Sequence, residues 1–281
     1  MEGMNHLVLS GGGPNGMIQM GVLHAAIKEG VLGEIKTLYA VSAGAFLGAS
    51  LALRVPIETI CEYFIERPWD KWIKFTVGSK GLVNSTLFRD AVLPLFNSCD
   101  IPPTITIGEA LSTMGVELHI FVTNVATMES TDLFQFPDLQ VIDAISMSCA
   151  LFPLFTPLNY GGKTYMDGGY SCNFPIEACL AAHDPATIFA VNICVEQNLH
   201  PDLQEADMAK LVEHVMMHLA YRLSDYHRSH QLAQQCPAYI QVKAQTVLKA
   251  SVWTDFLECK EHRRTMFEYG TTIKSTRLKT G

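Results

Sequence analysis

The distribution of apolar and polar residues along the chain predicts short buried strands that alternate with helices. Residues 6–9 and 37–41 are short, apolar and rich in strand formers, and a helical pattern follows each of them. The later runs 116–125 and 186–195 are almost continuously apolar, as expected for parallel strands covered on both faces. A strand, a helix and a second strand in this order form a right-handed βαβ unit. The pattern therefore predicts an α/β fold with parallel strands.

The last third of the chain has a mainly helical pattern. Residues 203–235 and 253–269 carry apolar side chains at helical spacing, and residues 239–243 between them are typical of an edge strand. Neither an internal repeat nor a linker marks a boundary. We therefore expect a single domain over residues 1–281.

Composition and charge narrow the class of protein. The chain has 281 residues, of which 48% are hydrophobic and 17% charged, so it can bury a large core. The net charge is −8 and basic runs are absent from the sequence, which argues against nucleic acid as a partner and against strong electrostatic docking to anionic lipid. The eight cysteines are scattered without CxxC pairs, which predicts free thiols in a reducing compartment.

Targeting and membrane signals are weak. The N-terminus lacks a basic region followed by an apolar stretch, and apolar residues never run together for about eighteen positions. We expect a soluble, cytoplasmic protein and leave peripheral contact with a membrane open. Residues 69–75 mix two tryptophans and a phenylalanine with lysines, so they form either an interfacial lid over lipid headgroups or aromatic packing under a surface loop. The oligomeric state is not indicated.

Ser42 lies where the apolar strand of residues 37–41 gives way to a helical pattern. A serine at such a corner is either the N-cap of the helix or a nucleophile held in a tight turn with its hydroxyl projecting from the sheet. A nucleophile elbow needs small residues two positions before and two after the serine, to avoid a clash between strand and helix. Those positions are Ala40 and Gly44, so the sequence permits either reading.

A glycine-rich loop, residues 10–16, follows the first predicted strand. A phosphate-binding P-loop needs Lys and then Ser or Thr after the last glycine, Gly16, where Met17 and Ile18 stand instead. A dinucleotide-binding fold needs an acid near the end of the second strand, and that strand ends at Ser42. The loop therefore fits neither nucleotide-binding pattern.

The remaining catalytic use of this loop is an oxyanion hole, in which backbone N–H groups and the positive end of the next helix face a developing alkoxide. Pro14 has no N–H, so the donors would be Gly12, Gly13 or Asn15. Parallel strands release their loops at one edge of the sheet, which allows the loop to converge on Ser42. The alternative is a glycine turn that serves only close helix packing.

A second candidate follows the irregular segment of residues 150–157, whose two prolines leave leucine and aromatic side chains on a stiff loop that lines an acyl channel or the core. The glycine pair at 161–162 predicts a two-residue hairpin, and its second strand ends at Asp167. Gly168 and Gly169 would let that carboxylate bend towards a neighbouring site. Taken alone, the motif is also compatible with an ordinary turn.

Together these motifs resemble the patatin-like phospholipase family over about residues 5–195, leaving a helical part over about residues 200–281. The motifs that carry the resemblance are the loop Gly11–Gly16, the pentapeptide around Ser42, the segment 150–157, and Asp167-Gly168-Gly169 with Asn173 and Pro175. The resemblance implies a three-layer α/β/α fold with a mostly parallel central sheet.

The resemblance also implies the chemistry. In that family a Ser–Asp dyad replaces a triad, which implies Ser42 as the nucleophile and Asp167 as the general base. The amides of Gly11, Gly12 and Gly13 are implied as the oxyanion hole. The implied function is a lipid acyl hydrolase of phospholipase A or lysophospholipase type, which acts on phospholipid or lysophospholipid esters without a metal or other cofactor.

Two positions depart from the family's pattern, and two alternatives follow. Asn15 stands where Arg or Lys is frequent, which removes a cation for a headgroup phosphate or a structural anion contact, and Ala40 stands where Gly is usual. These departures motivate a catalytically silent lipid-binding or scaffolding protein of the same fold. A Ser-His-Asp esterase that uses His183 or His200 is the other alternative. The four histidines within 214–230 lack the acidic context of a zinc motif, so we expect no metal.

Overall fold

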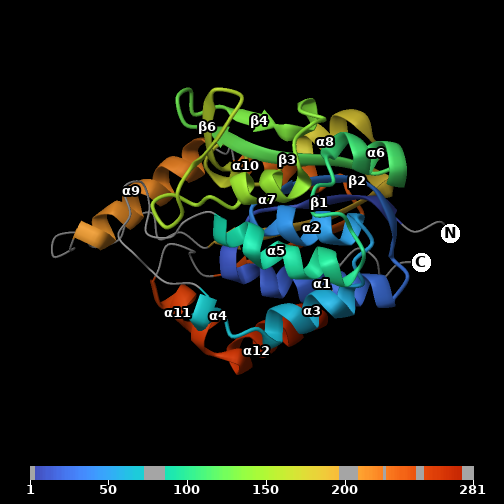
Figure 1. The fold of residues 1–281 in the computed structure, drawn as a ribbon, viewed down its shortest axis with the longest axis horizontal. Coiled ribbons are helices and arrows are strands. Elements are labelled where there is room, and N and C mark those ends of the chain that lie inside the picture. Colours follow the sequence, from blue (N-terminus) through green and yellow to red (C-terminus); the bar gives the residue numbers. More distant parts are fainter. Residues whose placement is uncertain (1–3, 73–85, 196–207, 224–225, 245–249, 274–281) are drawn as a thin grey trace.

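The computed structural model describes residues 4–72, 86–195, 208–223, 226–244 and 250–273 (Figure 1). A mostly parallel sheet crosses the molecule in the strand order β5-β6-β3-β2-β1-β7-β8, with β4 paired to β3. The strands are β1 Met4–Leu9, β2 Leu32–Val41, β3 Glu117–Asn124, β4 Ser130–Asp132, β5 Leu158–Tyr160, β6 Lys163–Asp167, β7 Ile188–Val195 and β8 Ala238–Ala244. The strands β1, β2, β3, β7 and β8 are parallel, whereas β4, β5 and β6 add antiparallel pairs at one side.

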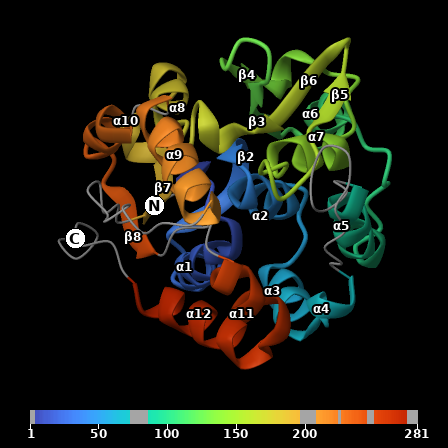
Figure 2. The same ribbon diagram turned by 90° about the vertical axis from the view of Figure 1, so that its left-hand side faces the viewer.

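Helices cover both faces of this sheet, so the predicted three-layer α/β fold is confirmed (Figures 1 and 2). The helices are α1 Gly16–Lys28, α2 Ala43–Ala52, α3 Ile57–Glu66, α4 Trp69–Trp72, α5 Thr86–Ser98, α6 Ile107–Met114, α7 Val141–Ser148, α8 Ile176–Ala182, α9 Met208–Leu223, α10 Tyr226–Ala233, α11 Ala250–Glu258 and α12 Lys260–Thr272. Short 3-10 turns include η1 Gly13–Asn15 and η3 Gly168–Tyr170. Among the described residues, no helix combines the length and the apolar character needed to cross a bilayer.

The alternation of side chains along β1 and β2 explains the two apolar layers. On β1, Leu7 and Leu9 point into the larger core, which lies under α1, α2 and α7. Val8 between them points into the smaller core, which lies under α8 and α10. Successive strand residues face opposite sides of a sheet, so a strand buried on both sides is apolar at every position. This burial on both faces explains why the strand segments of the sequence are continuously apolar.

The C-terminal helices differ from the sequence prediction. Residues 253–269 were expected to form one helix, but the structure contains α11 and α12 with Cys259 as the N-cap of the second. Helix α12 packs along α1, and the contact depends on glycine. A Cβ on Gly21 would lie 2.1 Å from the carbonyl oxygen of Phe267, and one on Gly270 would lie 2.1 Å from that of Ile18. The two backbones therefore approach more closely than any larger residue allows.

Arg263 on α12 joins three segments through backbone carbonyls. Its side chain is buried, and its guanidinium donates to the carbonyl oxygens of Ile65, Arg67, Phe256 and Leu257 at 2.6 to 3.2 Å. These carbonyls lie at the C-terminal ends of α3 and α11, where helix carbonyls lack partners within the helix. Arg263 therefore satisfies two helix ends and fixes α11 against α3.

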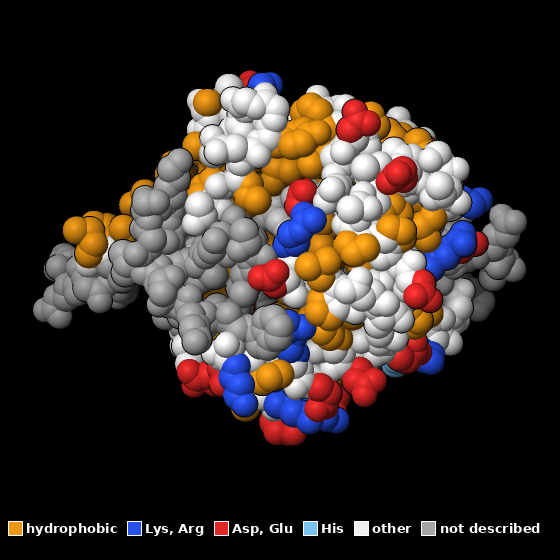
Figure 3. All heavy atoms as spheres, in the orientation of Figure 1, with side chains coloured by type: hydrophobic (Ala, Val, Ile, Leu, Met, Phe, Trp, Pro, Cys, Tyr) orange, Lys and Arg blue, Asp and Glu red, His pale blue; other side chains and the backbone are white. Residues whose placement is uncertain are grey.

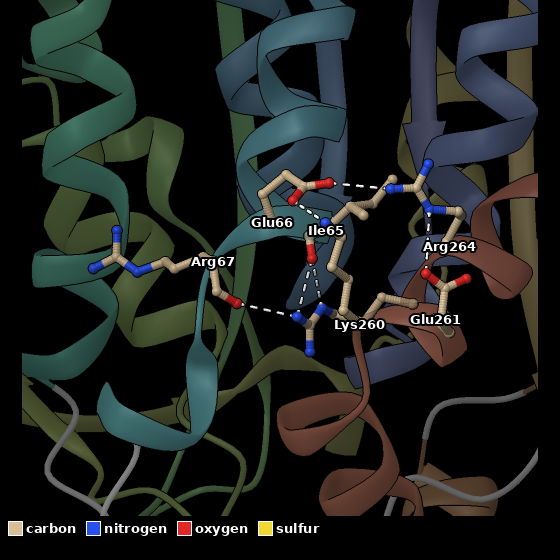
Figure 4. A network of polar contacts seen from close by, with 7 residues as sticks. Ile65, Glu66, Arg67, Lys260, Glu261 and Arg264 are labelled. Atoms are coloured by element: carbon tan, nitrogen blue, oxygen red, sulfur yellow. Dashed lines mark hydrogen bonds and ion pairs between the residues drawn. The ribbon is translucent and has the colours of Figure 1, made fainter.

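A surface ion-pair network lies beside this buried guanidinium (Figure 4). Glu66 accepts from Lys260 and, at 3.1 Å, from Arg264. All three side chains are exposed, and exposed pairs of this kind contribute about 0–1 kcal/mol each. We therefore attribute the joint between α3 and α12 mainly to Arg263.

Candidate active site

The sheet brings Ser42 and Asp167 together from opposite sides of β3. Strand β2 runs parallel to β3 with Val41 beside Phe121, and β6 runs antiparallel to β3 with Asp167 beside Val122. Ser42 directly follows Val41, so it reaches the same level of β3 as Asp167. Two residues 125 positions apart in the chain thereby face each other across one strand.

The Ser42 hydroxyl donates a hydrogen bond to Oδ2 of Asp167 at 2.6 Å, and both residues are buried. The Ser42 backbone has φ 53° and ψ −126°, a conformation that is strained for a residue with a side chain. Ser42 occupies the N-cap position of α2, but its side chain makes no capping hydrogen bond. The hydroxyl is directed to the carboxylate, as a nucleophile elbow requires.

Contacts around the turn hold this conformation. The Ser42 amide donates to Oγ of Ser148 at 2.8 Å, and that hydroxyl donates to the Phe121 carbonyl at 2.7 Å. A Cβ on Gly44 would lie 2.5 Å from the carbonyl oxygen of Ser10, so the position requires glycine. Ala40 is fully buried on β2. The sequence analysis missed Ser148, whose only signal was its place in a helix rich in small residues.

Asp167 has the environment of a base that works near neutral pH. Burial raises the pKa of its carboxyl to about 6, while hydrogen bonds from Ser42 and from the Gly169 amide act in the opposite direction. The Gly169 amide donates to Oδ1 at 2.8 Å and leaves Oδ2 to the Ser42 hydroxyl. A Cβ on Gly168 would lie 2.4 Å from the Phe121 carbonyl oxygen, so the chain can turn here only at glycine.

The glycine loop lies against Ser42, but its three amides are not equivalent. A Cβ on Gly11 would lie 3.2 Å from Cβ of Ser42, which shows how close the loop approaches. The Gly11 amide, however, donates to the Asn173 carbonyl at 3.1 Å. In this conformation that amide is occupied, and Gly11 positions the loop on the segment that follows Asp167. We therefore assign no oxyanion contact to the Gly11 amide.

Gly12 and Gly13 remain as candidate donors. Within the described residues, neither amide donates to a protein acceptor, and Gly13 has φ 50°. Asn15 is buried beside them. Its backbone N–H donates to the Gly12 carbonyl at 3.0 Å, so we do not assign that N–H to the oxyanion hole. Gly16 lies close to α2, since a Cβ there would be 3.1 Å from Cβ of Ala43.

An apolar cavity adjoins the Ser42 hydroxyl. Its walls come from η1, α1, α2, α3, α4, α5, α11 and residues 149–155, and they include Gly13, Met17, Phe46, Phe88, Phe155 and Trp253. Phe155 contacts Phe88 and Trp253 with ring centroids 4.7 Å and 5.6 Å apart. The segment 150–157 therefore lines this cavity and is also part of the packed core.

The segment 69–75 is only partly described. Trp69 is buried in the cavity wall, and its indole N–H donates to the Phe64 carbonyl at 2.9 Å. For Trp69, the interfacial-lid interpretation is wrong, because its ring packs in the interior. Residues 73–75 lie outside the described residues.

The histidines considered as a triad base or as metal ligands are His183, His200, His214 and His218. His183 lies at the end of α8, with Nε2 3.3 Å from the Tyr39 hydroxyl and its ring stacked on His6 at 3.7 Å. His200 lies outside the described residues. The rings of His214 and His218 are 6.0 Å apart, and the described part of the chain holds no group of three or more potential metal ligands.

Comparisons with known proteins bear on the family to which this chain belongs. The chain is 26% identical over 191 residues to the "Probable lipid hydrolase 463L" of Invertebrate iridescent virus 6, a match that covers 63% of this chain and 64% of that protein. It is 25% identical over 184 residues to the "Uncharacterized protein R571" of Acanthamoeba polyphaga mimivirus, covering 62% of this chain and 60% of that one. The chain thus spans less than two thirds of the length of either relative.

The fold is similar to that of VipD from Legionella pneumophila, with a TM-score of 0.54 at 15% identity over 96% of this chain and 66% of that structure. The family model described as "Patatin-like phospholipase" matches residues 7–180, which include the glycine loop, Ser42 and Asp167. On this match, the chain belongs to the patatin-like phospholipase family.

Proposed function

We propose that this protein is a lipid acyl hydrolase that cleaves carboxylic esters of phospholipids or lysophospholipids, with Ser42 as nucleophile and Asp167 as general base. The observation that carries the proposal is the 2.6 Å hydrogen bond between the two side chains at a strained strand-to-helix turn. The apolar cavity beside Ser42 supports a substrate with an acyl chain. Family membership and the name of the iridescent virus relative agree with lipid hydrolysis.

The first half of the reaction forms an acyl-enzyme. Oγ of Ser42 attacks the ester carbonyl carbon while its proton passes to Oδ2 of Asp167. The carbonyl oxygen becomes an oxyanion that accepts hydrogen bonds from the Gly12 and Gly13 amides. When the carbon–oxygen bond to the alcohol breaks, Asp167 returns the proton to the leaving oxygen, so the alcohol departs neutral.

The second half repeats these steps with water. Asp167 takes a proton from a water molecule as its oxygen attacks the acyl carbon, and the same amides stabilise the second oxyanion. Breaking the bond to Oγ releases the fatty acid, and the proton held by Asp167 returns to Ser42. Loss of one oxyanion donor in other hydrolases costs about 2.7 to 4 kcal/mol, so the glycine amides contribute a large share of the rate.

A triad that uses His183 is disfavoured by the position of that residue. The Ser42 hydroxyl contacts the carboxylate directly, whereas His183 contacts Tyr39 and His6. The variant His183→Ala with His200→Ala tests both histidines. Dyad chemistry predicts that ester hydrolysis survives the double substitution, and loss of hydrolysis in a folded variant would favour the triad.

A catalytically silent protein of the same fold is the second candidate, motivated by Ala40 and Asn15. The experiment that separates the two is incubation with a fluorophosphonate, with Ser42→Ala as the blank. The hydrolase is expected to be modified at Ser42 and to release fatty acid from a panel of defined phospholipids, lysophospholipids and monoglycerides. An unlabelled Ser42 with no turnover across the panel would leave only the silent protein.

A further inference from the structure

Helix α9 exposes an apolar stripe. Six of the ten large hydrophobic side chains that are exposed in the described part of the chain belong to this helix. They are 41% to 77% exposed: Met208, Leu211, Val212, Val215, Leu219 and Leu223. Met208, Val212, Val215, Leu219 and Leu223 follow one another at three or four residues, and Leu211 lies beside Val212, so all six are on one side of the helix over its whole length.

The stripe lies on the side of the molecule that carries the proposed active site. Helix α9 contacts η3, the turn that begins directly after Asp167. Figure 2 looks onto the edge where the parallel strands end, and α9 lies in front of that edge. In Figure 3 hydrophobic side chains are visible on the upper side of the projection where Figure 1 places α9.

A second exposed apolar side chain links this surface to the cavity. Tyr170 of η3 donates to the carbonyl of Phe152, whose side chain is 39% exposed. Phe152 belongs to the segment 150–157, and its neighbours Leu151 and Phe155 line the cavity beside Ser42. The turn η3 therefore joins α9 to the segment that forms the cavity wall, and Phe152 adds an exposed apolar side chain there, although Tyr170 itself is buried.

We infer that the α9 stripe, together with Phe152, is the surface by which this protein docks on a lipid aggregate. The inference rests on the proposed function, because a lipid ester must leave a bilayer or micelle to reach Ser42. An amphipathic helix lying in the interfacial plane buries its apolar side in the acyl boundary. Docking through α9 would place the site next to the lipids from which it draws substrate.

The net charge identifies the kind of lipid surface. The chain carries 28 acidic and 20 basic residues, so an anionic bilayer offers little general attraction. We therefore expect contact through α9 to be driven by burial of apolar side chains. Salt screens charge interactions but weakens this hydrophobic contribution little. We expect binding to zwitterionic phosphatidylcholine vesicles that persists at raised ionic strength.

The test replaces three stripe residues together, Leu211→Gln, Val215→Gln and Leu219→Gln, since glutamine keeps helix propensity. Flotation with phosphatidylcholine vesicles is expected to show the bound-to-free ratio falling at least about tenfold, because three apolar side chains no longer enter the lipid. The matched control is Leu111→Gln on α6, which is also exposed and lies on the opposite side of the molecule (Figure 1). This control is expected to bind as the unmodified protein does.

An activity comparison separates docking from chemistry. Hydrolysis of vesicle phospholipid by the triple variant is expected to fall about as much as vesicle binding, whereas hydrolysis of a soluble short-chain ester stays unchanged. Circular dichroism and thermal unfolding report whether the variant is folded. If it is not, Val215→Gln alone is used, with an expected loss of about threefold in binding.

Several outcomes would overturn the inference: no binding of the unmodified protein to vesicles, equal binding by the triple variant, or an equal loss in Leu111→Gln. A dimer in sedimentation that the triple variant dissociates would assign the stripe to a second copy of the chain. Failure of the proposed function is seen separately. In that case no ester is hydrolysed, yet the unmodified protein and Ser42→Ala still bind vesicles through α9.

Discussion

At the scale of single residues, the proposed mechanism gives one buried carboxylate the work that hydrolases often divide between an imidazole and an acid. Asp167 accepts a hydrogen bond from the Ser42 hydroxyl at Oδ2 and one from the Gly169 amide at Oδ1. An exposed aspartate has a pKa near 3.9 and is a weak base. Burial moves the pKa of Asp167 to about 6, where the carboxylate accepts a proton more readily while remaining ionised at neutral pH.

The pH dependence of activity follows from this value. The base must be deprotonated, so kcat/KM for a soluble ester is expected to rise with pH around a midpoint of about 6 and then to level off at higher pH. The measurement is a pH–rate profile in buffers of constant ionic strength, with Ser42→Ala as the blank. A rise centred near pH 4 would show that the carboxyl is not desolvated as the structure has it.

Asp167→Asn separates catalysis from stability. Removing the base is expected to lower kcat by roughly 10²- to 10⁴-fold. The folded-state pKa is raised, so ionised Asp167 destabilises the fold above about pH 6, and this penalty vanishes at pH values below the unfolded-state pKa. The variant should therefore gain roughly 1–3 kcal/mol of stability at pH 8 and nothing near pH 3.

Denaturant unfolding at the two pH values measures this gain. Asp138→Asn, at an exposed position, is the control and should change stability little at either pH. A loss of stability in Asp167→Asn at pH 8 would contradict the assignment of a buried, partly desolvated charge.

At the scale of elements, the ends of β2, β6 and α7 fix the strained turn at Ser42. The positions of the strands and of the glycine turns were open to sequence reasoning, because apolar runs, turn glycines and a serine at a corner are local signals. The contact of Ser148 with the Ser42 amide could not be predicted from the sequence. It joins residues 106 positions apart, and nothing in the sequence around Ser148 marks its side chain as a partner of that amide. The division of α11 from α12 was missed for a similar reason: Cys259 is an unusual N-cap.

Ser148→Ala tests the support that α7 gives to the turn. It removes the acceptor of the Ser42 amide and leaves a buried N–H unpaired, which costs roughly 1–3 kcal/mol. We expect kcat for a soluble ester to fall about 10- to 100-fold, because Ser42 leaves its productive conformation part of the time. Kinetics and thermal unfolding of the same variant give both quantities.

Ser146→Ala is the matched control. Ser146 is buried on the same helix, but its hydroxyl donates only to the Ile142 carbonyl within α7. It should cost stability with little change in kcat. Equal losses of kcat in both variants would mean that α7 as a whole, and not the Ser148 contact, supports the turn.

At the scale of the whole molecule, the C-terminal helices complete a site whose motifs lie in the N-terminal part. Trp253 and Phe256 of α11 line the cavity beside Ser42, and Arg263 of α12 holds the end of α11 through the carbonyls of Phe256 and Leu257. The sequence predicted helices in this region but not their role. Arg263 donates to backbone carbonyls, which every residue carries, so no pattern of oppositely charged side chains in the sequence could indicate its partners.

Arg263→Lys is expected to destabilise the fold by roughly 2–4 kcal/mol, because an ammonium group cannot reach the four carbonyls that the planar guanidinium joins. As α11 loosens, hydrolysis of long-chain esters should fall more than hydrolysis of butyrate esters. Arg264→Lys, whose side chain is exposed and pairs with Glu66, is the control. Parallel losses for both chain lengths would show that Arg263 does not act through the cavity wall.

The packing of α12 on α1 also has a consequence for biosynthesis. Helix α1 begins at the glycine loop, and Gly270, which fits against it, is translated more than 200 codons after α1. Until those codons have been read, the groove that receives α12 is open to water, and a molecular chaperone could bind there. On the proposed function, hydrolytic competence would then arise after translation of α12, and a ribosome paused before that point would carry an inactive nascent chain.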